Sequence, residues 1–207
     1  VRDALNFARN EKLTVTFSGA RTGISGGAVT QGGLLLSLER MNRILEIRKG
    51  NKEKATAKLQ PGLLLSDFNR NLDDASLYYP PDPTEKTASL GGTVSCDASG
   101  SLSFGFGSTR KYVHGLSVML PSGEILKLKR GQYKADTYDN FHFSLNGSEV
   151  TLKRPQYHLP DIKNAAGYYT RSNMDLIDLF IGSEGSLGSI TEIEVTVLPK
   201  PPLAAGI

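Results

Sequence analysis

The segment SGARTGISGG, residues 18–27, combines four glycines with two serines, a threonine and an arginine. Glycines let consecutive backbone amides turn toward one point and let a ligand approach the main chain, which is the chemistry of an anion site. The hydroxyls of Ser18, Thr22 and Ser25 would add hydrogen-bond donors. Arg21 has two interpretations, a charge-assisted contact to a phosphate or a surface ion pair. Taken alone, the composition of this loop is consistent with either a phosphate site or a flexible turn.

Three familiar motifs fail to describe this loop. It lacks the Gly-Lys-Ser/Thr ending of a nucleotide-triphosphatase loop, and its glycines do not open the helix of a dinucleotide-binding βαβ unit. GISGG matches the Gly-x-Ser-x-Gly nucleophile elbow, with Ser25 as the serine. That serine must lie between a strand and a helix, whereas the chain continues here through AVTQGGLLLSL toward another strand. A serine hydrolase is therefore disfavoured.

The elements around the loop predict a small α/β unit over residues 1–48. Apolar residues recur at helical spacing over 1–8, and LTVTF at 13–17 is typical of a strand that leads into the loop. GGLLLSLERM at 32–41 is nearly continuously apolar, which predicts a strand covered on both faces. ILEIR at 44–48 is a further candidate strand.

Residues 49–207 predict a second unit dominated by antiparallel sheet. Asn146 and Gly147 suit a tight hairpin turn, and Asn173 is a possible helix cap. The last strand should alternate, with Thr191 and Ile193 on one face and Ile190 and Glu192 on the other. The predicted elements are a strand near 54–62, a helix near 64–72, hairpins over 115–129 and 141–153, a helix over 174–182 and a strand over 189–199.

Composition limits the class of protein. The 207 residues, 39% hydrophobic and 22% charged, suffice for one domain or two small ones. A net charge of +3 without a basic stripe argues against a nucleic-acid partner. Cys96, the single cysteine, cannot form an internal disulfide, and no apolar run predicts a transmembrane segment, so we expect a cytoplasmic protein. The missing initiator methionine and the proline-rich end favour a piece of a longer chain.

Three further stretches rich in small residues follow the opening loop. They are SLGGTVSCDASG from residue 89, FGFGSTRKYV from residue 104 and IGSEGSLGSIT from residue 181, with the rigid connector YYPPDPT before them. In order and spacing, these motifs resemble the FAD-binding domain of the vanillyl-alcohol oxidase and p-cresol methylhydroxylase superfamily. The likeness is greatest to its FAD-linked D-lactate and glycolate dehydrogenase branch. It implies an α+β domain of two lobes, a small one over 1–48 and a larger one over 49–207, with FAD between them.

The resemblance also implies which residues bind FAD. The opening loop would hold the pyrophosphate, the next two segments would lie along the cofactor and near its isoalloxazine, and the last would lie beside the adenine and ribose. The implied residues are Ser18, Gly19, Ala20, Arg21, Thr22, Gly23, Ser25 and Gly26; Pro81, Asp82 and Pro83; Leu90, Gly91, Gly92, Ser95, Ser99 and Gly100; Gly107 and Arg110; and Gly185, Gly188, Ile190 and Thr191.

Several positions depart from the family pattern or allow two roles. Arg21 and Gly23 stand where relatives more often have glycine and serine, and Phe106 lacks the phenolic hydroxyl of the usual tyrosine. Arg110 could contact the cofactor or form a core ion pair. Glu184 could touch the cofactor or cap backbone amides, and we favour the capping role. Cys96 is expected to be a small buried residue.

The positions of the histidines argue against covalent attachment of FAD and against a metal site. Some relatives attach FAD covalently through a histidine near the pyrophosphate loop, but the opening loop has none, so we expect non-covalent FAD. His114, His142 and His158 are too far apart in sequence to form a helical ligand pair, so no metal site is predicted.

The resemblance implies oxidation of a 2-hydroxy acid by hydride transfer to flavin N5. In such proteins the substrate-binding groups belong largely to a carboxyl-terminal domain that would follow residue 207, so we nominate no catalytic residue, and the electron acceptor is unspecified. Two alternatives remain. One is an NADPH-dependent reductase on the same fold, like UDP-N-acetylenolpyruvoylglucosamine reductase, and the other is a non-catalytic flavin-binding module.

Overall fold

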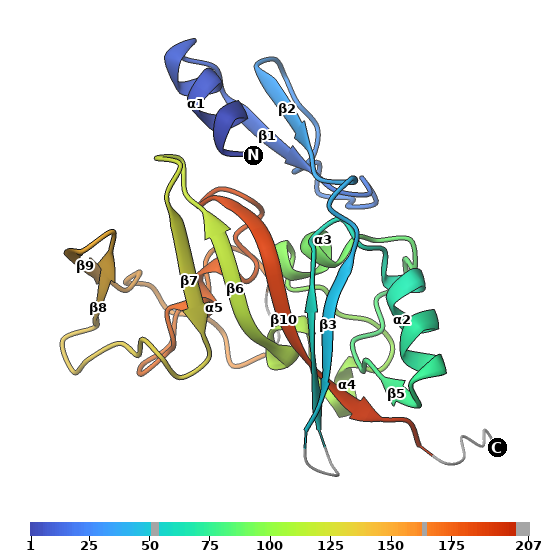
Figure 1. Cartoon of the computed structure of the whole chain (residues 1–207). Coiled ribbons are helices and arrows are strands. Elements are labelled where there is room, and N and C mark those ends of the chain that lie inside the picture. The colour runs from blue at the N-terminus through green and yellow to red at the C-terminus, as the bar shows by residue number, and fades with distance from the viewer. Residues whose placement is uncertain (51–53, 163–164, 202–207) are drawn as a thin grey trace.

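The chain folds into a small N-terminal lobe and a larger lobe built on an antiparallel sheet (Figure 1). The computed structural model describes residues 1–50, 54–162 and 165–201. Helices and sheet are both present, with the sheet dominant in the larger lobe. This arrangement confirms the predicted α+β class.

The small lobe contains α1 (Arg2–Asn10), β1 (Val15–Ser18) and β2 (Leu34–Ser37). α1 buries Leu5 and Ala8, as their helical spacing predicts. β1 and β2 pair in parallel, and residues 19–33 connect them. The prediction that β2 is covered on both faces is wrong, because its residues alternate between half-buried and exposed and Leu35 is 41% exposed. The described part of this lobe offers one helix, which can cover at most one face of the strand pair.

The larger lobe is organised around its last strand. β10 lies between β4 and β6 in the strand order β3-β4-β10-β6-β7, and β5 pairs with its far end. All of these pairs are antiparallel. The strands are β3 (Ile44–Lys49), β4 (Ala55–Leu59), β5 (Leu77–Tyr78), β6 (Val113–Met119), β7 (Ile125–Lys129) and β10 (Ser189–Pro199).

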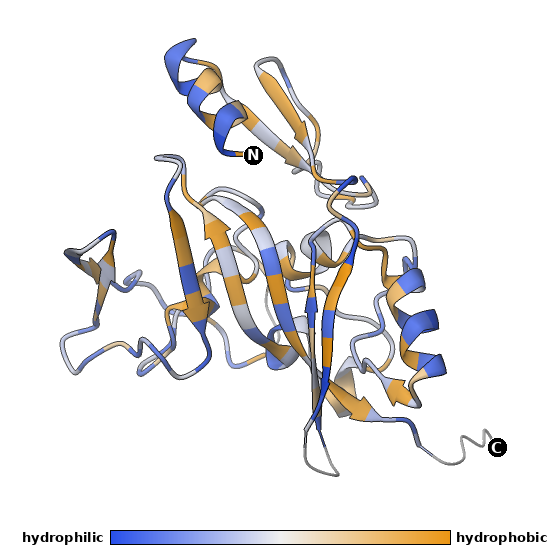
Figure 2. Cartoon of the chain, in the orientation of Figure 1, coloured by the Kyte–Doolittle hydropathy of each residue, from blue (hydrophilic) through white to orange (hydrophobic). Residues whose placement is uncertain are grey.

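One face of this sheet belongs to the main hydrophobic core. Ala57 and Ile193 from the sheet share that core with Phe68, Leu90 and Ile177 from the helices. The opposite face carries polar side chains, and hydrophobic and hydrophilic residues alternate along the strands (Figure 2). The helices are α2 (Leu65–Asp74), α3 (Leu90–Ser95), α4 (Ser103–Phe106), the 3-10 helix η1 (Thr109–Tyr112) and α5 (Ile177–Phe180).

Strand pairing places the boundary between the lobes earlier in the chain than the position expected from the sequence. The expected boundary after Arg48 falls inside β3, which pairs with β4 in the large sheet. On this criterion the small lobe ends before Ile44. The local motif suggested a strand but could not say which sheet it joins.

Both predicted hairpins are confirmed. β6 and β7 pair, and so do β8 (Asn140–Leu145) and β9 (Ser148–Lys153). The turn of the second hairpin places Asn146 at φ 49° and Gly147 at φ 82°, the left-handed conformations that an Asn-Gly turn requires.

Other local predictions need correction. The helix expected over 174–182 is reduced to α5, and Asn173 does not cap it, because this residue lies at φ 58° three positions before the helix cap Leu176. The alternation expected in β10 fails at its start, where Ile190 is buried together with Ile193. A register shift between Ile190 and Glu192 causes this, since an irregularity of this kind puts neighbouring residues out of phase. α3 was missed, because its LGGTVS sequence contains two glycines.

Candidate functional site

A cavity of about 580 Å³ lies between the two lobes. Four segments that are distant in sequence line it: the opening loop, residues 83–85, α3 with the residues after it, and the loop that follows α5. The predicted residues found on its wall are Ser18, Gly19, Ala20, Arg21, Thr22, Gly23, Ser25, Pro83, Gly91, Gly92, Ser95, Ser99, Gly185, Gly188 and Ile190.

Some predicted residues lie outside this wall. Leu90 is fully buried in the core, and the Thr191 hydroxyl donates to the Ser117 carbonyl at 3.0 Å. A Cβ on Gly100 would overlap the carbonyl oxygen of Asp82, so this glycine permits a close contact between two protein segments. The others away from the wall are Gly26, Pro81, Asp82, Gly107 and Arg110.

A close contact between the lobes explains the first glycine of the opening loop. A Cβ on Gly19 would overlap the hydroxyl oxygen of Ser89, which caps α3 and accepts the Gly92 N–H at 3.2 Å. Ser89 also lines the cavity. Any larger residue at position 19 would therefore have to displace the Ser89 hydroxyl from its capping position. Helix-capping serines followed by glycines are a signal that could have identified Ser89 from sequence.

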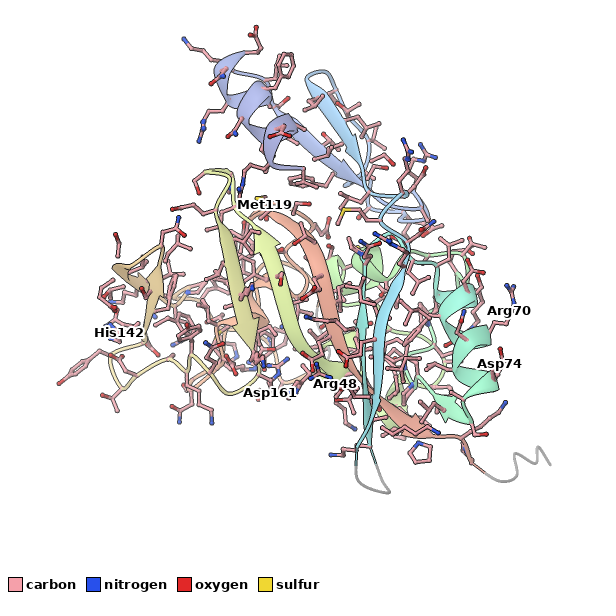
Figure 3. The ribbon with its side chains drawn as sticks, in the orientation of Figure 1. Arg48, Arg70, Asp74, Met119, His142 and Asp161 are labelled. Atoms are coloured by element: carbon pink, nitrogen blue, oxygen red, sulfur yellow. The ribbon has the colours of Figure 1, made fainter. Side chains whose placement is uncertain are left out.

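A second close contact involves the loop after α5. Gly188 lies at φ 146°, and a Cβ there would come within 2.7 Å of the Met119 carbonyl oxygen. Met119 is at the end of β6 that faces the small lobe (Figure 3). Glycine at 188 lets this wall of the cavity approach the sheet.

Arg21 forms a surface ion pair in this structure. Its Nη2 lies 2.7 Å from Glu39 Oε1, and the two side chains are 58% and 46% exposed. Its backbone has a φ of 59°, which is unusual for a residue with a side chain and which glycine adopts more readily. Because Arg21 also lines the cavity, the ion pair and a ligand contact compete for one guanidinium.

Glu184 reaches across the cavity. Its Oε2 accepts a hydrogen bond from Ser25 Oγ at 3.4 Å, although 159 positions separate the two residues. Its backbone N–H donates to the Ser95 carbonyl at 2.9 Å with φ at 50°. The carboxylate thus belongs to the cavity wall, where we had favoured a capping role for it.

Sequence reasoning also missed two polar residues of the wall. Hydrogen bonds from the hydroxyl and the backbone N–H of Thr87, at 2.6 and 2.9 Å, hold the pKa of the Glu85 carboxyl below its usual value. Ser189 is 1% exposed, and its hydroxyl finds no hydrogen-bond partner among the described residues. A buried hydroxyl without a partner is costly, and this residue lies at the cavity wall.

A second hollow, of about 350 Å³, lies on the outer face of the large sheet. Two ion pairs lie on its wall: Arg48 Nε lies 2.6 Å from Glu46 Oε1, and Lys58 Nζ lies 2.9 Å from Glu192 Oε1. Arg48 projects from β3 (Figure 3). None of the predicted residues lines this hollow, so the cavity between the lobes is the candidate site.

The cavity wall offers hydrogen-bond donors that suit an anionic group. Backbone amides and hydroxyls of the opening loop suit a pyrophosphate, and most of the other wall residues are small or apolar, apart from the carboxylates of Glu85 and Glu184. The close contacts at Gly19 and Gly188 shape the cavity, and the Ser189 hydroxyl offers an unused hydrogen-bonding group. Among the residues that the structure describes, no group of three His, Cys, Asp or Glu side chains could hold a metal ion.

Comparison with known families identifies the cofactor of the domain. Residues 1–129 match the family described as "FAD binding domain". The chain belongs to this FAD-binding family. FAD is therefore the cofactor of the domain, and the expected resemblance to FAD-linked 2-hydroxy acid dehydrogenases is confirmed by the relatives.

The FAD-binding domain is similar over nearly its whole length to curated dehydrogenases. It is 38% identical to a D-lactate dehydrogenase of Anaerostipes hadrus over 97% of this chain and 34% of that protein. It is 33% identical to the glycolate oxidase subunit GlcD of Bacillus subtilis, over 95% of this chain and 34% of the relative. A D-2-hydroxyglutarate dehydrogenase of Xanthomonas citri pv. viticola is 31% identical over 98% of this chain and 35% of the relative. The chain thus spans about a third of these relatives.

A solved structure shares the fold. Alkyldihydroxyacetonephosphate synthase superimposes with a TM-score of 0.66 at 20% identity, over 98% of this chain and 30% of that one. At this level of identity the likeness concerns the fold alone.

Proposed function

We propose that this domain holds FAD non-covalently in a longer protein that oxidises a 2-hydroxy acid. The observation that carries the proposal is the 38% identity to a D-lactate dehydrogenase over 97% of the chain. Relatives named for glycolate and D-2-hydroxyglutarate support the same substrate class. Bound FAD would accept a hydride equivalent at its N5 atom.

The domain's own residues would bind and orient the cofactor. Amides of the opening loop and the Thr22 hydroxyl would hold the pyrophosphate, joined by the Ser25 hydroxyl once it turns away from Glu184. The carboxylates of Glu85 and Glu184 are suited to accept hydrogen bonds and would repel phosphate, so they would face neutral hydroxyl or amine groups. Gly92 would let the flavin approach α3 closely, whereas Gly91 makes room for Pro61, whose Cβ would lie 2.6 Å from a Cβ at position 91.

We assign no catalytic residue within the described chain, and the base that removes the substrate's hydroxyl proton would come from the rest of the protein.

No helix of the described residues is long and apolar enough to cross a membrane. A cytoplasmic location is proposed from the single cysteine, and the electron acceptor is left open.

Anaerobic flavin reduction in the full-length protein tests the substrate class. We expect D-lactate, glycolate or D-2-hydroxyglutarate to bleach the flavin absorbance, with L-lactate as a stereochemical control for the chiral substrates. Bleaching by NADPH with none by hydroxy acids would instead indicate the reductase alternative. A flavin that none of these compounds reduces would indicate a non-catalytic flavin-binding module.

Titration with FAD and FMN tests the pyrophosphate assignment separately. We expect FAD to bind at least about 10-fold more tightly than FMN, because FMN lacks the second phosphate and the adenine, and tenfold corresponds to only about 1.4 kcal/mol. Equal affinities would contradict the role of the opening loop.

Acid precipitation tests the mode of attachment. None of the three histidines lies on the described cavity wall, and His142 lies on the distant β8–β9 hairpin (Figure 3). We expect yellow supernatant after precipitation. Flavin that stays with the washed pellet would show a covalent bond and overturn the proposal.

A further inference from the structure

Arg110 occupies a half-hidden position behind the cavity. Its side chain is 16% exposed, and its Nε and backbone N–H both donate to the Asp97 carboxylate, at 3.2 and 2.9 Å. Nη1 donates to the Asp178 carbonyl at 2.6 Å, and Nη2 donates to the Ile181 carbonyl at 2.5 Å. The Tyr169 ring lies over the guanidinium, with its centroid 4.2 Å away. One side chain thus connects three separate segments.

Asp97 belongs to the wall segment formed by α3 and the residues after it. Its neighbours Cys96 and Ala98 line the cavity, whereas Asp97 is 4% exposed and does not. Its backbone has a φ of 45°, which turns the carboxylate away from the cavity and toward Arg110. Such a conformation is costly for a residue with a side chain, and it persists where the surroundings hold it.

Ile181 lies at the start of the loop after α5, three residues before Glu184, the first residue of this loop on the cavity wall. Immediately after it, Gly182 donates its N–H to the Val94 carbonyl at 3.0 Å, and Glu184 donates its N–H to the Ser95 carbonyl at 2.9 Å. These bonds join the loop after α5 to the end of α3. Arg110 therefore binds the two wall segments from behind, at the point where they are hydrogen-bonded to each other.

We propose that Arg110 is a positioning residue of the FAD site. It fixes the segment around Asp97 and the loop after Ile181 relative to each other without touching the cofactor. Arginine suits this task because its planar fork donates to a carboxylate and to carbonyls at once, whereas lysine offers a point charge. The inference rests on the proposed placement of FAD in the cavity and goes beyond it by assigning Arg110 an indirect role.

Arg110→Lys tests the inference, with FAD dissociation constant and visible circular dichroism of the bound flavin as readouts. We expect binding to weaken about 10-fold or more and the flavin dichroism to change, because wall segments free to shift no longer match the cofactor. Asp97→Asn should weaken binding in the same direction. If the two act as one unit, the double variant should bind no worse than the weaker single variant.

Arg154→Lys is the matched control. Arg154 is similarly hidden, at 12% exposure, and its Nε and Nη2 contact both carboxylate oxygens of Asp139 at 2.8 Å, but neither residue lines the cavity. The Arg154→Lys substitution should lower thermal stability while leaving FAD affinity and flavin dichroism unchanged. A purely structural role for Arg110 predicts the same behaviour in both lysine variants.

Four outcomes decide the inference. Unchanged FAD affinity and dichroism in Arg110→Lys would overturn it, and so would equal weakening in Arg154→Lys. If Arg110→Lys does not fold, Asp97→Asn carries the same test: weakened binding with altered dichroism supports the inference, and wild-type values overturn it. Failure of the wild-type protein to bind FAD would refute the cofactor site itself, which is a separate result.

Discussion

At the scale of single residues, the opening loop contains two different kinds of position. Gly19 has no room for a side chain because Ser89 from the other lobe lies against it, whereas a Cβ on Gly23 would meet no atom within 4 Å. Arg21 has room but already has a partner in Glu39. The sequence shows three small or polar residues in a flexible-looking loop, and the structure separates their roles.

Gly19→Ala should weaken FAD binding, whereas the control Gly105→Ala should not, because Gly105 lies outside the cavity wall and a Cβ there would meet no atom within 4 Å. The new methyl group at position 19 must displace the Ser89 hydroxyl, and loss of a helix cap costs about 1 kcal/mol, or about 5-fold in affinity if the cap is needed for binding. Isothermal titration of both variants measures the difference. Equal affinities would mean that the contact between loop and α3 does not shape the site.

Replacing Glu39, the ion-pair partner of Arg21, should reveal whether Arg21 also contacts phosphate. Exposed ion pairs contribute about 0–1 kcal/mol, so Glu39→Gln should barely affect stability while releasing the guanidinium. If Arg21 contacts phosphate, Arg21→Ala should weaken FAD binding about 5- to 30-fold, which is about 1–2 kcal/mol, and Glu39→Gln should strengthen it. FAD affinities unaffected by both substitutions would leave Arg21 with the surface pair alone.

At the scale of elements, the β8–β9 hairpin is held by charges at its base. Arg154 from the end of β9 contacts Asp139, which lies at φ 65° just before β8. Hydrogen bonds from Arg154 and then Gln156 hold the pKa of the Asp139 carboxyl below its usual value. The hairpin lies apart from the cavity, so its stability can be varied without touching the site.

Asp139→Asn should lower stability at neutral pH and have little effect in acid. A carboxyl whose folded pKa is depressed contributes stability above its ordinary pKa of about 3.9, and that contribution is lost as pH falls through the lower folded value. Asparagine tolerates the left-handed conformation, so the change isolates the charge. Thermal unfolding of the wild type and the variant, from neutral pH down to about pH 3, measures this difference in stability. The range extends below the ordinary aspartate pKa.

The control for this experiment is Asp161→Asn. Asp161 is 95% exposed and 3.7 Å from Arg171, an arrangement from which we expect no measurable stability (Figure 3). A pH-independent loss in Asp139→Asn, or an equal loss in Asp161→Asn, would contradict the assigned role of the Arg154 pair.

At the scale of the whole molecule, the cofactor should couple the two lobes. The cavity draws its wall from both, and the contacts of Gly19 with Ser89 and of Ser25 with Glu184 cross between them. A ligand at 100 times its dissociation constant stabilises the folded state by about 2.7 kcal/mol. That stabilisation should appear on both sides of the cavity.

Hydrogen exchange with and without FAD measures this coupling. We expect slower exchange in residues 18–28 of the small lobe and in residues 89–99 and 182–190 of the larger lobe. The β8–β9 hairpin should not change, since it lies outside the cavity wall. Protection confined to one lobe would show that FAD does not bridge them.

The sequence by itself determined the features that depend on neighbours along the chain. Glycine spacing marked the segments of the site, the Asn146–Gly147 turn set a hairpin, and the order of motifs indicated the family. These signals are local, because turn conformation and amphipathic spacing are set by residues a few positions apart.

Tertiary structure alone decided which of the predicted residues meet. Gly91 lines the cavity while its neighbour Leu90 is buried in the core, and Arg110 lies behind the wall that its motif suggested it would join. Glu184 meets Ser25 across 159 positions. Such contacts depend on how two lobes and a bulged central strand pack together, and packing between distant segments leaves no period or spacing in the sequence.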